Sequence, residues 1–179
     1  MHTQAPTRRR FQQLLLGLPL WSLATTPAWL STAAHAHGER HDGHMKAGPV
    51  VKEQKPWGIA AEPSQAQRTV QIRMTDDMKF TPNHLEVREG ETLRLRAVNR
   101  GKVMHEIVIG TREELAAHAE MMKKHPNMEH DEPYMTHVSP GKRGDIVWTF
   151  NRSGDFEFAC LIPGHFEAGM RGTVRVRPA

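Results

Sequence analysis

Near the end of the chain, three side chains that can bind a metal ion stand at equal intervals of five residues. Cys160 offers a thiolate, His165 an imidazole and Met170 a thioether. One thiolate, two imidazoles and a weak axial thioether form the trigonal site that holds copper in electron-transfer proteins. The segment therefore predicts a copper site that needs one more histidine from elsewhere in the chain.

Cys160 is the only cysteine among the 179 residues, and this excludes several other kinds of site. Structural zinc sites built on several thiolates, iron–sulfur clusters and intrachain disulfides all need more cysteines. The missing histidine must come from another strand. His105 is the best candidate because it begins a predicted strand after a turn, whereas His84 fits better as a residue on the face of a strand.

The elements that must position these ligands are predicted to be strands. From Arg68 onward, apolar and polar residues alternate in short segments separated by turns, which is typical of an antiparallel sandwich or barrel with one buried face. The segments are residues 69–74, 84–88, 92–98, 104–109, 145–150, 155–159 and 172–177. A single helix interrupts them, because Thr111 and Glu114 form a capping box and no helix breaker follows before Pro126.

The first 36 residues have the order of an export signal. Three arginines at 8–10 precede an apolar run at 14–30, and Ala34-His35-Ala36 is a small-residue cleavage site. The paired arginines resemble a twin-arginine signal. We therefore expect residues 1–36 to be removed and the mature protein to act in the periplasm without a permanent membrane anchor.

The mature chain is expected to contain a tail at 37–67 and one domain at 68–179. The tail is polar and rich in proline, so we predict that it is flexible. Its histidines at 37, 41 and 44 either bind metal or belong to a solvated linker, and composition leaves both interpretations open. Loss of the leader lowers the formal net charge from +4 to +1, and no basic block interleaved with aromatics suggests nucleic-acid binding.

With these residues in view, the chain resembles the cupredoxins, the type 1 blue copper family that includes plastocyanin and azurin. The resemblance covers about residues 68–178 and rests on the strand entry at 80–92 and on the loop at 158–172. It implies a Greek-key β-sandwich with copper near one end. It also implies that His105, Cys160 and His165 are equatorial ligands and Met170 the axial ligand.

Two features depart from the family pattern. Many cupredoxins have asparagine directly after the first ligand histidine, where its side chain braces the cysteine loop, but here that position is Glu106. A change beside the ligands can alter the colour and potential of the site, so blue and green variants both stay open. The second departure is an insertion between the His105 strand and the Trp148 strand.

The insertion contains the predicted helix and a loop rich in methionine and histidine. His118, Met121, Met122 and His125 recur at helical spacing and share one face. Met121 or Met122 can instead pack the helix onto the sandwich. Thioethers prefer Cu(I) and imidazole accepts both copper states, which makes a secondary copper site a hypothesis. Its candidate ligands are Met121, Met122, His125, Met128, His130, Met135 and His137.

The mixture of a type 1 loop with methionine- and histidine-rich segments is similar to that of periplasmic copper-tolerance cupredoxins. We therefore expect a copper-binding protein that acts in copper tolerance. The alternative is a soluble periplasmic electron shuttle whose partner protein docks near His165. A copper enzyme is not expected, because further His-x-His clusters are missing and the predicted cleavage splits His35-Ala36-His37.

Overall fold

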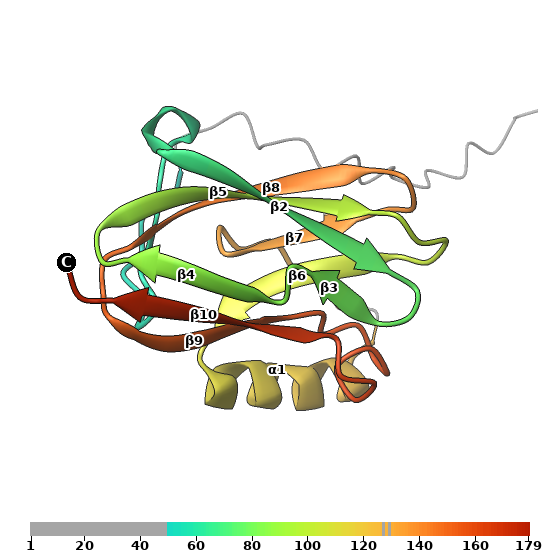
Figure 1. Cartoon of the computed structure of the whole chain (residues 1–179). Coiled ribbons are helices and arrows are strands. Elements are labelled where there is room, and N and C mark those ends of the chain that lie inside the picture. The colour runs from blue at the N-terminus through green and yellow to red at the C-terminus, as the bar shows by residue number, and fades with distance from the viewer. Residues whose placement is uncertain (1–49, 127, 129) are drawn as a thin grey trace, which may run out of the picture. The chain divides into compact units, whose positions relative to one another are not determined.

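Two five-stranded sheets face each other in the part of the chain that the computed structural model describes, residues 50–126, 128 and 130–179 (Figure 1). The first sheet contains, in spatial order, β1 (Ile59–Ala60), β8 (Arg143–Phe150), β5 (Glu91–Asn99), β2 (Arg68–Thr75) and β3 (Lys79–Thr81). The second contains β4 (His84–Arg88), β10 (Arg171–Arg177), β9 (Gly154–Ala159), β6 (His105–Gly110) and β7 (Met135–Val138). The predicted all-β sandwich is therefore confirmed.

Most of the named strand pairs are antiparallel, as expected, but two are parallel. These are β2 with β5 and β10 with β4. The chain passes from β3 in the first sheet to β4 in the second and returns to the first at β5. Because of this excursion, β5 enters the sheet beside β2 in the same direction. The alternation of apolar residues predicted the strands. It could not predict the order in which the chain visits the two sheets, or the parallel pairs that result.

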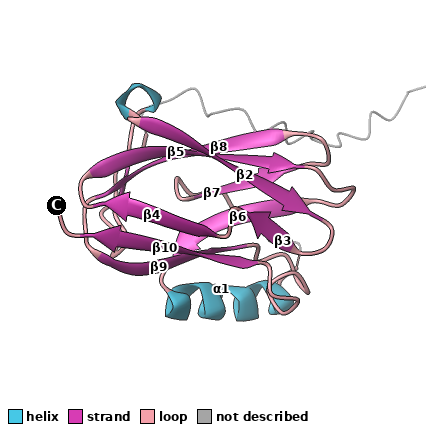
Figure 2. Ribbon diagram, viewed as in Figure 1, coloured by secondary structure: helices cyan, strands magenta, loops and turns pink. Residues whose placement is uncertain are grey.

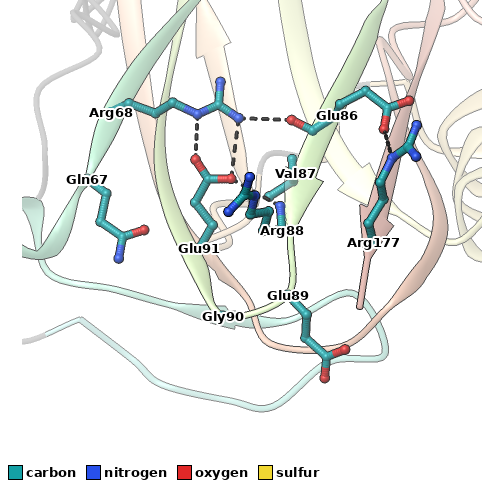
Figure 3. Close-up of a pocket in the computed structure, with 9 residues that line it drawn as sticks. All are labelled: Gln67, Arg68, Glu86, Val87, Arg88, Glu89, Gly90, Glu91 and Arg177. Atoms are coloured by element: carbon teal, nitrogen blue, oxygen red, sulfur yellow. Dashed lines mark hydrogen bonds and ion pairs between the residues drawn. The ribbon is translucent and has the colours of Figure 1, made fainter. Parts of the chain in front are cut away.

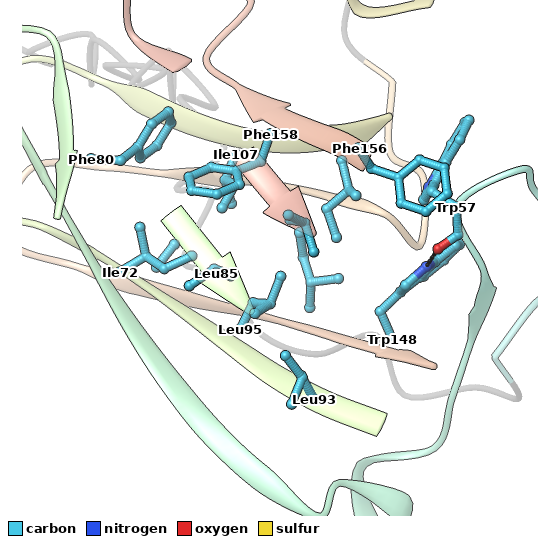
Figure 4. Packing of buried hydrophobic residues seen from close by; sticks show 14 of the residues in the cluster. Trp57, Ile72, Phe80, Leu85, Leu93, Leu95, Ile107, Trp148, Phe156 and Phe158 are labelled. Carbon is cyan, nitrogen blue, oxygen red and sulfur yellow. Dashed lines mark hydrogen bonds between the residues drawn. The ribbon is translucent and has the colours of Figure 1, made fainter. Parts of the chain in front are cut away.

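The core lies between the two sheets and is formed by the inward-facing side chains of both (Figure 4). Alternate residues of β5 and β10 are buried, as their apolar period requires. Phe80 and Phe158 meet edge to face across the core, with ring centroids 5.0 Å apart. Burial of this apolar surface is the main force that holds the sheets together.

Helix α1 (Arg112–Lys124) covers the outer face of the second sheet (Figure 2). Its predicted capping box is present, because the Thr111 side chain accepts a hydrogen bond from the Glu114 backbone and the Glu114 side chain accepts one from the Thr111 backbone. The apolar side of α1 packs on β6 and β9 in a second cluster, which we call the helix cluster. Its buried members are Val108, Leu115, Ala119, Met122, Met135, Ala159 and Leu161.

The folded part begins before Arg68, which corrects the predicted boundary of the tail. β1 pairs with β8, and a 3-10 turn (Pro63–Gln65) follows it. Trp57 is buried, and its carbonyl accepts a hydrogen bond of 3.0 Å from the Trp148 ring. This segment is short and rich in proline. Its composition therefore did not predict that it packs against the sandwich. The predicted leader and residues 37–49 of the tail lie outside the described residues.

Gly58 allows this close approach. A Cβ at this position would lie 2.2 Å from the Thr149 carbonyl oxygen, and the φ of Gly58, +131°, is a conformation that other residues rarely adopt.

Among the described residues, no helix is long and apolar enough to cross a membrane.

Charged residues line a groove at the end of the sandwich where β4 and β10 finish (Figure 3). Arg68 pairs with Glu91, and Arg177 pairs with Glu86. These pairs lie at the other end of β10 from the loop that carries the predicted ligands. The groove therefore lies at the opposite end of the sandwich from the predicted metal site.

Replacement of Trp57 tests whether residues before Arg68 belong to the core. Trp57→Ala removes a side chain that is 3% exposed and is expected to lower the free energy of unfolding by about 3–5 kcal/mol, because a cavity remains. Trp57→Phe is the matched control and should cost much less, because the buried Nε1 of Trp57 has no hydrogen-bond partner among the described residues. Chemical denaturation measures both, and an unchanged midpoint for Trp57→Ala would contradict the docking.

Candidate metal centre

Three of the four predicted ligands meet at one end of the sandwich. His105 is the first residue of β6, Cys160 directly follows β9, and His165 lies in the loop between β9 and β10. Their donor atoms all lie within 4.8 Å of one another. The Cys160 Sγ is 3.3 Å from the His165 Nδ1, and the two imidazole rings are 5.1 Å apart between centroids. His105 and Cys160 are fully buried, whereas His165 is partly exposed.

Met170 is held beside Cys160 by backbone hydrogen bonds. The Cys160 N–H donates to the Met170 carbonyl at 3.1 Å, and the Met170 N–H donates to the His165 carbonyl at 3.0 Å. Gly164 and Gly169 both adopt a φ of +89°, which lets the loop turn back within this short distance. The Met170 side chain is buried in the same core cluster as Cys160. We call these four residues, His105, Cys160, His165 and Met170, the Cys160 centre.

The imidazole of His105 is oriented for a ligand that the protein itself does not supply. Its Nε2 lies 3.2 Å from the Asp76 carboxylate, while its Nδ1 is buried and has no hydrogen-bond partner among the described residues. A buried ring nitrogen without a partner costs free energy. A carboxylate on the outer nitrogen is the usual way to fix the ring of a metal-binding histidine. The free Nδ1 therefore fits a metal ligand.

Asp76 is well suited to hold the His105 ring. The Lys102 N–H donates to its carboxylate at 2.7 Å. This hydrogen bond, together with those from Val103 and His105, lowers the pKa of Asp76 although some desolvation opposes it. Asp76 is therefore an anion at neutral pH and accepts from the Nε2–H of the ring. Sequence analysis did not identify Asp76, because 29 residues separate it from His105.

Glu106 braces the cysteine loop at the position where asparagine is common. Its side chain is buried, and one carboxylate oxygen accepts a hydrogen bond of 2.7 Å from the Leu161 N–H. The other oxygen lies 2.8 Å from the Nε2 of His137 on β7. The Glu106 backbone N–H also lies 3.5 Å from the Cys160 Sγ and donates to it. The residue that departs from the family pattern thus still contacts the loop.

Burial favours the uncharged forms of the Cys160 and His165 side chains. It raises the pKa of the Cys160 thiol to about 12, and the nearby negative charge of Glu106 acts in the same direction. Burial also lowers the pKa of His165, with a smaller contribution from the adjacent His105 ring. At neutral pH the Cys160 side chain is therefore a thiol, and a metal ion must displace its proton to bind the sulfur.

The donor set fits copper. A thiolate with two imidazoles in one plane and a thioether as a weak fourth ligand is the set used by type 1 copper sites. His84, the alternative to His105, lies on the exposed face of β4 and contacts Thr173 and Glu86. It does not approach Cys160, so the structure brings His105 and not His84 to the other donors.

The candidates for a secondary copper site fall into separate environments. Met122 and Met135 are buried in the helix cluster, whereas Met121 and Met128 are exposed. His125 is the C-terminal cap of α1 and is also exposed. Part of the insertion predicted as loop is β7, in which Met135 and His137 pair with Val108 and Glu106 of β6.

Among the described residues, His130 is the one candidate for the secondary site whose ring contacts another imidazole. Its ring lies beside that of His118, with centroids 4.8 Å apart. The helical spacing had placed His118 with Met121, Met122 and His125, but not with His130. The pair forms only because the chain after Pro126 returns toward α1, which spacing cannot predict.

Comparisons with known proteins agree with this geometry. The family model for copper-binding proteins of the plastocyanin/azurin family matches residues 66–177. The copper-resistant cuproprotein CopI of Rubrivivax gelatinosus is 47% identical over 146 residues, which cover 81% of this chain and 86% of that protein. CopI of Pseudomonas aeruginosa is 33% identical over 154 residues, covering 68% of this chain and 83% of that protein.

Solved structures show the same fold. Auracyanin B superimposes with a TM-score of 0.58 at 24% identity, covering 70% of this chain and all of that chain. Reduced auracyanin from Roseiflexus castenholzii gives a TM-score of 0.55 at 24% identity, covering 63% of this chain and 99% of that chain. At this level of identity the likeness concerns the fold alone.

Replacement of Glu106 tests whether its contact with the Leu161 N–H stabilises the cysteine loop. Glu106→Leu leaves the Leu161 N–H buried without an acceptor, which should cost about 1–3 kcal/mol of stability and shift the visible absorption of the copper-loaded protein. Glu106→Gln keeps an oxygen for Leu161 and loses only the charge beside His137, so a smaller loss of stability is expected. Glu113→Gln, an exposed residue of α1, is the control. Wild-type stability and absorption in Glu106→Leu would contradict the brace.

The raised pKa of Cys160 predicts that copper loading releases a proton. At about pH 8 imidazoles are neutral, so the thiol is the one ligand that must lose a proton. We expect close to one proton per Cu(II), measured by calorimetry in buffers with different ionisation enthalpies. Cys160→Ser should release none on loading. A binding enthalpy that does not change with the buffer would show that the sulfur is already a thiolate in the metal-free protein.

Proposed function

Because the chain belongs to the plastocyanin/azurin family of copper-binding proteins, we propose that it holds one redox-active type 1 copper in the periplasm and acts there in copper tolerance. The observation that carries the proposal is the arrangement at the Cys160 centre. His105, Cys160 and His165 each bring one donor atom within 4.8 Å of the others. The buried Nδ1 of His105 has no hydrogen-bond partner among the described residues.

In this proposal His105, Cys160 and His165 would hold the copper, and Met170 would be a further, weaker donor. The copper would supply one-electron exchange between Cu(I) and Cu(II). The protein's part is to keep the donors in place in both states. The backbone hydrogen bonds of the Cys160–Met170 loop, the Asp76 contact of His105 and the Glu106 contact of Leu161 all do so without any contribution from the metal.

Copper tolerance is favoured over general electron transfer by the curated relatives, which are named copper-resistant cuproproteins. The methionine- and histidine-rich insertion agrees with a protein that handles copper itself. We do not expect catalysis, and we expect export by the predicted leader at residues 1–36.

An electron shuttle is the second candidate, and the exposure of His165 favours it. This ligand is partly exposed, in a loop that also presents Pro163 and Phe166 at the surface. An apolar surface around an exposed ligand suits brief docking of a redox partner. The two candidates share the same copper site and differ in what the cell loses without the protein.

Complementation of a gene deletion separates them. Under aerobic and low-oxygen growth, the deletion strain should be sensitive to copper, and the wild-type gene should restore tolerance. Cys160→Ser should not restore tolerance, and the purified variant should lack the strong visible charge-transfer band. Met170→Leu is the matched variant, which should keep copper and the band but show a higher potential.

Two results would overturn the proposal. Retention of the visible band in Cys160→Ser would reject the ligand assignment. Unchanged copper tolerance in the deletion strain, together with reversible reduction of the protein by a periplasmic partner, would favour the electron shuttle.

A further inference from the structure

We propose that the carboxylate of Asp76 lowers the reduction potential of the Cys160 centre, acting through the His105 ring, so that the centre favours Cu(II) over Cu(I). This role rests on the proposed function, because Asp76 can act on a potential only if the centre binds copper. Asp76 lies outside the four proposed ligands, in the turn between β2 and β3. It is a positioning residue that also supplies a charge.

The contact between Asp76 and His105 joins a buried ring to a carboxylate at the surface. The His105 side chain is 0% exposed and that of Asp76 is 38% exposed, with 3.2 Å between the ring Nε2 and the carboxylate Oδ1. In the described part of the chain, this carboxylate is the only hydrogen-bond partner of the ring. If Nδ1 binds a metal, Nε2 carries the ring hydrogen and donates it to Asp76.

The turn between β5 and β6 is shaped to receive the carboxylate. The backbone N–H of Lys102 donates to one Asp76 oxygen at 2.7 Å, and that of Val103 donates to the other at 3.4 Å. A Cβ at Gly101 would lie 1.8 Å from the Oδ1 of Asp76, which is far too close for a real contact. Glycine at this position is therefore needed for the carboxylate to reach both the turn and the His105 ring.

A buried amide fixes this turn to the sandwich. Asn99, at the end of β5, is fully buried, and its Nδ2 donates to the carbonyl oxygens of Val103 and Val138 at 2.8 Å each. Its Oδ1 accepts from the Gly101 N–H, also at 2.8 Å. The backbone partners of Asp76 are therefore held without any contribution from a metal, and we expect the carboxylate to keep its place in both copper states.

A negative charge fixed at this position favours the more highly charged copper ion. A carboxylate that accepts from the outer nitrogen makes the ring a stronger electron-pair donor. Cu(II) gains more from a strong donor and a nearby anion than Cu(I) does. Loss of such an outer partner lowers metal affinity by about 10–100-fold. A tenfold smaller preference for Cu(II) over Cu(I) corresponds to about 59 mV in a one-electron potential.

The test is the reduction potential of the copper-loaded full-length protein, measured by redox titration of its visible band. Asp76→Asn keeps the shape of the side chain and one acceptor oxygen but removes the charge, so the potential should rise by about 59 mV, a tenfold change. Gly101→Ala leaves the carboxylate in the chain but displaces it, and should raise the potential too. Asp77→Asn, whose carboxylate contacts Thr75 and Lys79, is the matched control and should change it much less.

The metal-free protein gives a second readout that does not depend on copper. The proton on the His105 Nε2 should give an NMR signal that is moved downfield by its hydrogen bond to the carboxylate. This signal should move upfield in Asp76→Asn and in Gly101→Ala, because the charged acceptor is lost or displaced. It should keep its position in Asp77→Asn.

Two results would overturn this role of Asp76, and they are distinguishable. An unchanged or lower potential in Asp76→Asn, with the visible band retained, would show that the charge does not act on the centre. A wild-type protein that takes up copper without a visible band would reject the type 1 site of the proposed function, and the tuning of its potential with it.

Discussion

The buried carboxylate of Glu106 is the contact on which the metal end of the structure depends. One oxygen accepts from the backbone after Cys160, and the other lies against His137 of the edge strand β7. A single side chain thus ties the ligand loop, β6 and β7 together. Because it is buried, loss of either contact would leave a polar group without a partner. The insertion that carries β7 is therefore joined to the metal centre and not merely appended to the sandwich.

Three of the four proposed ligands could be grouped from the sequence because they are neighbours in one loop. Cys160, His165 and Met170 lie in one short loop, so their spacing alone indicates their chemistry. The strands were visible for the same reason, since alternation is a property of neighbouring residues. Whether these four residues bind copper stays a prediction, but their placement in one cluster agrees with it.

Contacts between distant segments could not be predicted. Asp76, in the turn between β2 and β3, reaches His105 only after the two sheets have packed together, and Trp57 contacts Trp148 across 91 residues of chain. Short strands such as β1 and β7 lack enough residues to show a period. The substitution of Glu106 for asparagine was seen in the sequence, but its two partners depend on the folded arrangement of β6, β7 and the cysteine loop.

The burial of both faces of β6 has a consequence for metal selection. His105 points to the metal centre and the next residue, Glu106, points to the opposite face, while their partners on β7 are Val138 and His137. A shift of this strand by one residue would exchange the two faces. It would place a carboxylate where the His105 imidazole lies, so that one thiolate and two imidazoles, the donors of a type 1 copper site, would no longer meet. The register of β6 against β7 and β9 therefore decides whether the proposed copper donors come together.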